Sequence, residues 1–259
     1  MKLVSLRLVA LVAAAALVLT GCAKLPTSSE VKVGSDIQGG LTTDYLYYSP
    51  SGPVEGASQQ EIINGFLNAA TGPQNDYQVA REFLSGDLAA KWSPSKELLV
   101  GDTRPQVSMV GATGARLTVK AVARIDETGR YHDLGDGIER VLTFGLVLEG
   151  DQWRINQAPD ATVLVRPVFD VLFKSYALYF YDKQNRYLVP DLRWFATRVS
   201  TSTRLVSALL AGPDGWLSGA VQNAFPDKTK LAIDSVTVEN GVAIVDLDAT
   251  ANTATVAQR

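Results

Sequence analysis

The chain contains a single cysteine, Cys22, so neither an intramolecular disulfide nor a CxxC metal or redox site can hold its fold together. The position of this cysteine is informative. It follows an unbroken apolar run from Leu8 to Leu19, and Lys2 and Arg7 precede that run. A basic start before a short apolar core is typical of a secretory signal. At ~1.5 Å per residue, the run is too short to cross a ~30 Å hydrocarbon layer as a helix.

The residues Leu19-Thr20-Gly21-Cys22 resemble a bacterial lipobox. The resemblance implies cleavage between Gly21 and Cys22, so that residues 1–21 leave as the signal peptide. It also implies a diacylglyceryl group on the Cys22 sulfur and an acyl chain, such as palmitate, on the new amine. Each buried methylene contributes about 0.8 kcal/mol, so two or three chains give a stable membrane anchor. The alternative is an ordinary signal peptide with an unrelated cysteine near its end.

Charge and composition narrow the function of the mature part. Loss of the signal leaves 22 basic against 27 acidic residues, a formal charge of −5. This balance argues against nucleic acid or anionic lipid headgroups as the main partner. Residues 22–57 are rich in Gly, Ser, Thr and Pro and predict a flexible, lipidated tether. Tyr45, Tyr47 and Tyr48 interrupt the tether, and we interpret them as a chance cluster rather than a docking segment.

Residues 58–160 predict a first α+β domain. Ser58 and Glu61 form a capping box at the start of one helix, and a second helix is expected from near Asn75 to Leu84. Alternating apolar residues then predict strands at 107–110, 117–125, 142–148 and 153–155. Helices followed by an antiparallel sheet form a layered α+β arrangement. The order resembles the cone-shaped, nuclear-transport-factor-two-like fold.

The pattern restarts after Pro159, and residues 174–259 predict a second α+β unit. Its expected elements are a strand at 176–181, an irregular or edge strand at 187–195, a helix at 201–211, a shorter helix at 216–221, and strands at 231–238 and 242–247. Asn240-Gly241 lies between the last two strands and is a strong hairpin signal.

Three sequence blocks resemble the LpqB family of actinobacterial lipoproteins: "GFLNAATGPQNDYQVAREFLSGDLAAKWSP", "LYFYDKQNRYLVPDLRWF" and "LVSALLAGPDGWLSGAVQNAFPDKTKLAIDSVTVENGVAIVDL". The last two are similar to the opening of a GerMN domain. The resemblance implies a lipoprotein on the outer face of the cytoplasmic membrane. It also implies an accessory of the Mtr two-component system that contacts the extracellular domain of the sensor histidine kinase and affects cell-wall and division physiology.

The chain departs from the family pattern at its C-terminal end. Family members continue through the rest of the GerMN domain and a large β-propeller, whereas this chain ends at Arg259. The resemblance therefore predicts that a helix and a strand of the GerMN domain are missing, as in a truncated form of a longer protein.

Acidic residues and one histidine form the only compact group of possible metal ligands or acid–base residues: His132, Asp133, Asp136 and Glu139. Neighbouring glycines mark this stretch as a solvent-exposed hairpin loop rather than a site. A second pair, Asp246 and Asp248, shares one face of a strand, and we expect Asp248 to cap the next helix.

Two further groups are ambiguous. Four tryptophans could form a sugar-binding face, although core or boundary packing is the favoured interpretation: Trp92, Trp153, Trp194 and Trp216. Asp191 and Arg193 within "VPDLRW" predict an ion pair or turn brace, with a partner contact as the alternative.

The sequence thus favours a non-enzymatic interaction lipoprotein without metal or cofactor, in which Cys22 is the one assigned site. Two alternatives come from other classes. One is a cone-fold hydrolase or small-ligand-binding protein, which requires a solvent-open cavity with Asp or Glu beside Tyr. The other is a cell-wall-glycan-binding lipoprotein, which requires several tryptophans on one exposed face.

Overall fold

The computed structural model describes residues 50–197, 200–213 and 215–255. All of these residues belong to one compact unit. The predicted signal peptide, Gly21, Cys22 and the tyrosine cluster of the tether lie outside the described residues. Within the part that is described, no helix is both long and apolar enough to cross a membrane.

The first helix begins as its sequence predicts. α3 spans Gln59–Ala69, and Ser58 is its N-cap. The Ser58 N–H donates to the Glu61 carboxylate over 2.8 Å, and the Glu61 N–H donates to the Ser58 hydroxyl over 3.4 Å. This reciprocal pair satisfies two backbone donors at the start of the helix. Its apolar face, which includes Phe66, packs into the main hydrophobic core.

The second expected helix is broken in the structure. Three consecutive residues from Asn75 have positive φ angles of 48°, 53° and 59°. The segment divides into the 3-10 helix η1 (Gln74–Tyr77) and the single turn of α4 (Gln78–Arg81). Leu84, expected as the last helical residue, forms a β-bridge to Ile155 instead. Pairing with the sheet therefore replaces the end of the expected helix, and α5 (Gly86–Lys91) follows.

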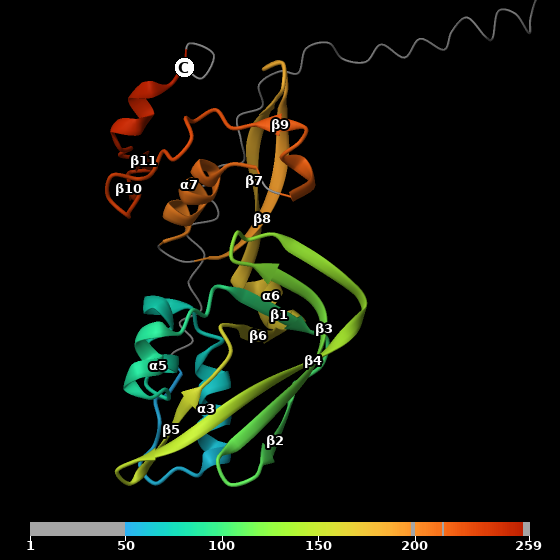
Figure 1. Ribbon diagram of the computed structural model, residues 1–259, viewed down its shortest axis with the longest axis vertical. Coiled ribbons are helices and arrows are strands. Elements are labelled where there is room, and N and C mark those ends of the chain that lie inside the picture. Colours follow the sequence, from blue (N-terminus) through green and yellow to red (C-terminus); the bar gives the residue numbers. More distant parts are fainter. Residues whose placement is uncertain (1–49, 198–199, 214, 256–259) are drawn as a thin grey trace, which may run out of the picture. The chain divides into compact units, whose positions relative to one another are not determined.

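A six-stranded sheet forms the centre of this region (Figure 1). Its strands are β1 (Glu97–Gly101), β2 (Gln106–Val110), β3 (Gly114–Asp126), β4 (Tyr131–Glu149), β5 (Gln152–Gln157) and β6 (Thr162–Val165). The order is β5-β4-β3-β1-β6, and β2 pairs with β3. β1 and β6 were not predicted from the sequence. Because β6 pairs with β1 in parallel, the sheet is mixed rather than wholly antiparallel.

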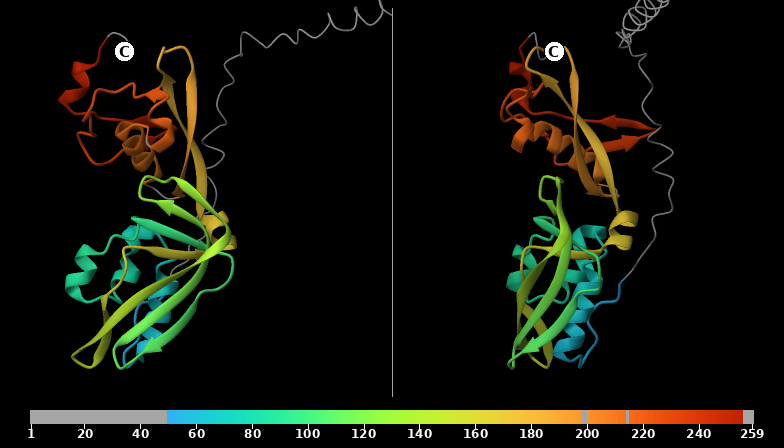
Figure 2. Two further views of the ribbon diagram at one scale, coloured as in Figure 1. Left: turned by 45° about the vertical axis from the view of Figure 1, so that its right-hand side comes forward. Right: turned by 90° about the vertical axis from the view of Figure 1, so that its right-hand side faces the viewer.

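The C-terminal region contains a three-stranded sheet, a hairpin and short helices (Figures 1 and 2). Its elements are α6 (Arg166–Leu172), β7 (Phe173–Asp182), β8 (Leu188–Ala196), α7 (Thr201–Ala211), η2 (Gly215–Leu217), β9 (Val221–Gln222), β10 (Thr237–Glu239), β11 (Val242–Ile244) and η3 (Ala249–Thr253). Asn240 and Gly241 have φ angles of 51° and 79°, which confirms the tight hairpin. The short helix expected at 216–221 is confirmed only at its start, where η2 includes Trp216 and Leu217; its end is wrong, because Val221 pairs with Asp182 of β7.

The two sheets share one set of buried residues. Leu98 of β1, Phe169 of α6, Phe173 of β7 and Ala196 of β8 all belong to a single apolar cluster. Helix α6, which was not predicted from the sequence, contributes Phe169 to this cluster. The α+β class is confirmed, whereas a cone-shaped first domain, a partial GerMN domain and a boundary near residues 160–174 remain predictions.

Candidate interaction surface

A buried ion pair lies on β8. The Arg193 guanidinium donates to the Asp191 carboxylate from Nη2 over 2.7 Å and from Nε over 3.1 Å. The Arg193 side chain is 1% exposed and that of Asp191 is 12% exposed. Arg130 lies 3.9 Å from the same carboxylate oxygen. The ion pair inferred from the sequence is therefore confirmed, and it is buried rather than on the surface.

The third Arg193 contact crosses to the first sheet. Its Nη1 donates to the main-chain oxygen of Thr128 over 2.9 Å, in the turn between β3 and β4. The Trp194 N–H donates to the main-chain oxygen of Gly129 in the same turn over 2.6 Å. Gly129 has a φ of 82°, and a Cβ there would lie 2.8 Å from the Phe195 ring. A glycine is thus required where this turn meets β8.

The turn is held together by one carboxylate. Asp126 accepts hydrogen bonds from the Thr128 hydroxyl at 2.6 Å, from the Arg130 N–H at 3.1 Å and from His132 Nε2 at 2.8 Å. Partial burial disfavours the charged form, but these hydrogen bonds outweigh it and hold the pKa of Asp126 below its usual value. The sole histidine, on β4, therefore helps to hold this turn through its hydrogen bond to Asp126.

Four aromatic rings pack against one another where β8 meets the first sheet. Trp194 lies 5.5 Å from Tyr131 and 5.3 Å from Phe169, measured between ring centroids, and Phe169 stacks on Phe173 at 5.2 Å. The rings come from β4, α6, β7 and β8. Tilted and offset contacts at these distances are favourable beyond simple burial.

Beyond this aromatic contact, the same face of β7 and β8 carries exposed apolar side chains. Three cross-strand pairs make up what we call the β7–β8 strip: Ala177 with Leu192, Tyr179 with Pro190, and Tyr181 with Leu188. Tyr179 is 54% exposed, Leu188 55% and Leu192 58%. A contiguous exposed apolar surface of this kind is characteristic of an interaction site.

The opposite face of these strands is covered. Leu178 and Phe180 are buried against Leu217 and Val221, and α7 contributes Leu205 to the same cluster. β8 is the edge strand of its sheet, and Pro190 lacks an N–H to donate to a further strand. The strip is therefore suited to contact through its side-chain face rather than by strand addition.

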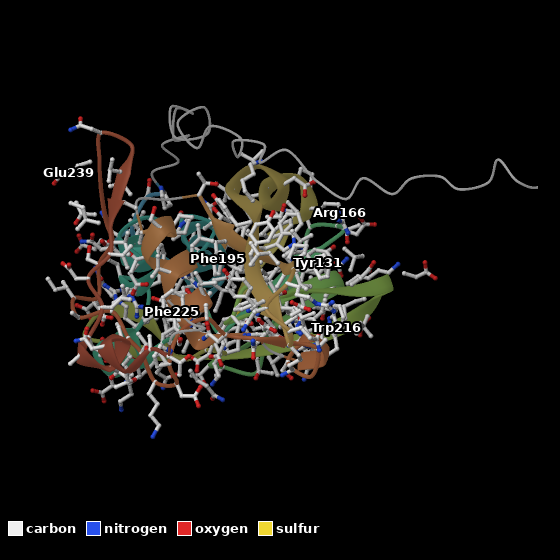
Figure 3. All side chains as sticks on the ribbon, turned by 90° about the horizontal axis from the view of Figure 1, so that it is seen from above. Tyr131, Arg166, Phe195, Trp216, Phe225 and Glu239 are labelled. Carbon is white, nitrogen blue, oxygen red and sulfur yellow. The ribbon has the colours of Figure 1, made fainter. Side chains whose placement is uncertain are left out.

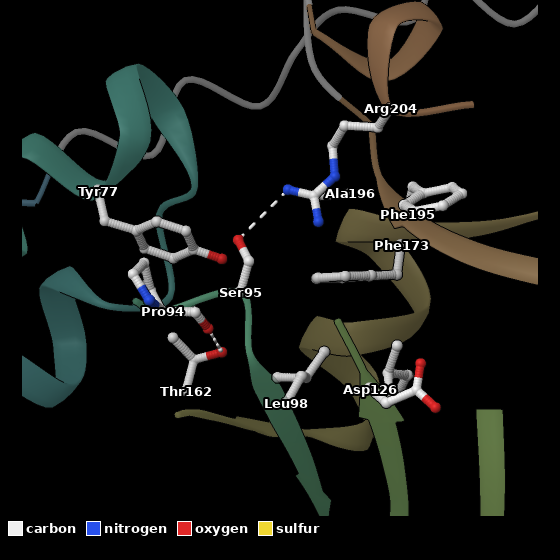
Figure 4. A pocket seen from close by; sticks show the side chains of 11 residues that line it. Tyr77, Pro94, Ser95, Leu98, Asp126, Thr162, Phe173, Phe195, Ala196 and Arg204 are labelled. Carbon is white, nitrogen blue, oxygen red and sulfur yellow. Dashed lines mark hydrogen bonds between the residues drawn. The ribbon is translucent and has the colours of Figure 1, made fainter. Parts of the chain in front are cut away.

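A small cavity is lined by residues of β1, β3, β7 and β8, among others (Figure 4). Tyr77 and Asp126 both line it, which is the residue combination that the enzyme alternative requires. Its volume is about 30 Å³, space for roughly one water molecule. Arg204 contributes to its wall, donating to the Ser95 hydroxyl over 3.3 Å. The cavity is too small to admit an organic substrate.

The acidic group expected on a loop lies instead on a strand. His132, Asp133, Asp136 and Glu139 all belong to β4, which continues through this stretch with a register irregularity opposite Val122. Gly135 and Gly137 adopt positive φ angles within this irregular strand, whereas Gly129 lies in the turn before it. In the described part of the chain, no three His, Cys, Asp or Glu side chains are grouped so as to hold a metal ion.

The other sequence candidates separate into core and surface. The Asp248 carboxylate accepts from the Thr250 N–H over 3.1 Å, which confirms it as the cap of η3. Trp92 is buried and donates from Nε1 to the Pro159 oxygen over 2.9 Å. Trp153 and Trp194 also pack against core clusters. Core or boundary packing is wrong for Trp216, which is 83% exposed on η2 (Figure 3).

The β7–β8 strip was not predicted, although the sequence carries a signal for it. Along β7, Leu178 and Phe180 alternate with Ala177, Tyr179 and Tyr181, so both faces of the strand are apolar. A two-sided apolar strand needs cover on both faces, and the described part of the chain covers only one along these residues.

Comparison with known proteins gives two family matches in order along the chain. Residues 52–170 match the N-terminal domain of Lipoprotein LpqB, and residues 177–259 match a sporulation and spore germination domain named Germane. No solved structure matches the chain.

Three relatives are all named Lipoprotein LpqB. The protein from Bifidobacterium longum is 30% identical over 90% of this chain, that from Cutibacterium acnes 28% over 96%, and that from Nocardia farcinica 30% over 83%. The aligned regions cover 43%, 42% and 36% of these relatives, so the chain spans about two fifths of their length.

Proposed function

Because the chain belongs to the LpqB family of lipoproteins, we propose that it is a non-enzymatic accessory protein on the outer face of the cytoplasmic membrane. Lipid on Cys22 anchors it there. Its partner is the extracellular domain of a two-component sensor kinase, that of the Mtr system, and its effect is on cell-envelope and division physiology.

The observation that carries the proposal is the order of the parts. A lipobox cysteine comes first, and the two family matches at residues 52–170 and 177–259 follow. An anchor and a tether restrict the folded part to a thin shell at the membrane, which raises its effective concentration near a membrane receptor. Catalysis is not needed for such a role.

The β7–β8 strip supports a protein partner. Tyr179 and Leu192 present aromatic and aliphatic surface in adjacent positions, with more than half of each side chain exposed. Tyrosine is enriched in interface cores because it combines apolar area with a hydroxyl group. The strip is therefore a suitable centre for a contact with the kinase domain.

The experiment measures binding of the mature chain, residues 22–259, to the immobilised extracellular domain of the kinase. We expect saturable binding that Leu192→Asp weakens at least tenfold. Val141→Asp on β4 is the matched control, since Val141 is 46% exposed and lies outside the strip. The proposal fails if the wild-type chain does not bind the kinase domain, whether Cys22 is lipidated or free.

A further inference from the structure

A groove lies beside β6, the strand at one end of the first sheet, and is lined by residues of α3 and α6 as well. It encloses about 1120 Å³. In the right-hand view of Figure 2, α3 and α6 lie along the same side of the molecule. Clefts for drug-sized ligands span roughly 300–1,000 Å³, so this groove has room for a larger ligand.

More than half of the residues that line the groove are Leu, Val or Pro. Val163 and Val165 lie two residues apart on β6, so their side chains point to the same face of the sheet. Val107 of β2 also lines the groove, and Val168 and Val171 line it from α6. The aliphatic surface therefore continues from the sheet onto α6.

The kind of apolar residue indicates the kind of ligand. None of the described residues that line the groove is aromatic, in contrast to the β7–β8 strip with its exposed Tyr179. Interface cores between proteins are enriched in Tyr, Trp and Phe. A protein segment would also bring backbone N–H and C=O groups that need hydrogen-bond partners. A hydrocarbon chain brings none, so the aliphatic lining favours an acyl chain.

The α3 side of the groove is polar and open to water. Gln60, Asn64 and Asn68 follow one another along α3 at intervals of four residues, and Asn64 and Asn68 are exposed. A ligand that lies on the valines therefore does not have to supply hydrogen bonds to these two amides.

One cation gives the groove its charge. Among the described lining residues, Arg104, on the loop between β1 and β2, is the only charged side chain, and it is exposed. The planar guanidinium donates two parallel hydrogen bonds to a phosphate. A single lipid headgroup needs only one such partner, whereas attraction to a whole membrane surface needs a cluster of basic residues.

We propose that this groove binds one anionic phospholipid, with an acyl chain against Val163, Val165 and Val171 and the phosphate at Arg104. The inference rests on the proposed function only for the source of the ligand, because the anchor on Cys22 keeps the groove near the bilayer. The size of the groove favours a two-chain phospholipid over a free fatty acid.

The test titrates the unlipidated mature chain, residues 22–259, into phosphatidylglycerol that carries an NBD fluorophore on a shortened acyl chain. The probe is kept below its critical micelle concentration, and its fluorescence rises when it enters an apolar site. We expect saturable binding of one lipid per chain, which unlabelled dioleoylphosphatidylglycerol displaces. Val171→Asp should weaken binding roughly tenfold or more, because a carboxylate then faces the acyl chain. Val171 is 52% exposed, so the variant should fold, and thermal melting checks this.

The headgroup is tested separately with the phosphatidylcholine form of the probe, whose own choline neutralises the phosphate. Wild type should prefer phosphatidylglycerol roughly fivefold or more, and Arg104→Gln should lose this preference while still binding the phosphatidylcholine form. Two matched controls should bind as wild type does: Val141→Asp on β4 and Leu192→Asp in the β7–β8 strip. The second control shows that the lipid does not bind the strip.

The inference is overturned if binding does not saturate, if Val171→Asp binds as tightly as the controls, or if wild type shows no headgroup preference. Binding of oleate without binding of phosphatidylglycerol would also overturn it. So would a Val171→Asp variant that binds lipid normally and the kinase domain weakly, since the groove would then be a protein site.

The two proposals fail separately. Kinase-domain binding without lipid binding overturns the groove and leaves the proposed function intact. Lipid binding without kinase-domain binding does the reverse.

Discussion

The Arg193 guanidinium donates to the main-chain oxygen of Thr128 over 2.9 Å, across 65 residues of sequence. It joins β8 to the turn between β3 and β4. The same guanidinium is paired with Asp191, so one buried cation satisfies a carboxylate and a backbone carbonyl together. The two sheets are thus linked by a polar contact as well as by shared core residues.

Arg193→Met should destabilise the protein by about 3–5 kcal/mol, because removing one partner leaves the buried Asp191 charge without its closest cation. Urea denaturation followed by tryptophan fluorescence measures the loss. The double variant Arg193→Met/Asp191→Leu should recover part of it, since both charges are then absent. A loss below about 1 kcal/mol for Arg193→Met, typical of an exposed pair, would show that the link is not buried in solution.

Gly129→Ala should destabilise the protein by about 1–3 kcal/mol more than Gly135→Ala, because only the first adds overpacking to strain. Both glycines have positive φ angles, 82° and 60°. A Cβ on Gly129 would lie 2.8 Å from the Phe195 ring, whereas a Cβ on Gly135 meets nothing within 4 Å. Thermal melting of the two variants gives the comparison. Equal losses would mean that Gly129 does not pack against β8.

Asp126 predicts a pH dependence of stability. Its pKa is below the usual value in the folded chain, so its contribution is fully present above the unfolded value of 3.8 and is lost as the pH falls through the lower, folded value. Asp126→Asn should therefore cost about 1–3 kcal/mol at pH 7, and the difference from wild type should shrink below about pH 4. Urea titrations at pH 7, 5 and 3.5 measure this. A difference that is constant with pH would refute the role of the charge.

Local signals in the sequence predicted the fold well. The Ser58–Glu61 capping box and the Asn240-Gly241 hairpin each depend on residues within a few positions, and both are confirmed. β1 and β6 were missed because each is a short apolar run that periodicity cannot distinguish from a helix or loop. Their pairing is parallel and spans about sixty residues, so no local pattern indicates it.

The contacts of Arg193 show the same limit of prediction from sequence. The pairing of Asp191 with Arg193 follows from two residues two positions apart on one strand, and the sequence predicted it. The contact to Thr128 depends on how two sheets pack, which sequence spacing does not reveal. His132 was assigned to a loop because glycines flank it, although Gly135 and Gly137 lie within the strand β4.

Membrane attachment through Cys22 can be tested separately from partner binding by the folded residues. Cys22→Ser removes the only thiol, so no thioether-linked lipid can form. We expect the wild-type chain to remain with membranes after an alkaline wash and the variant to stay uncleaved or to leave the membrane fraction. Its described residues are unchanged, so purified Cys22→Ser should bind the kinase domain as tightly as unlipidated wild type does. A variant that is processed normally and resists the wash would mean that something other than lipid on Cys22 holds the chain at the bilayer, and the anchoring proposal would be lost.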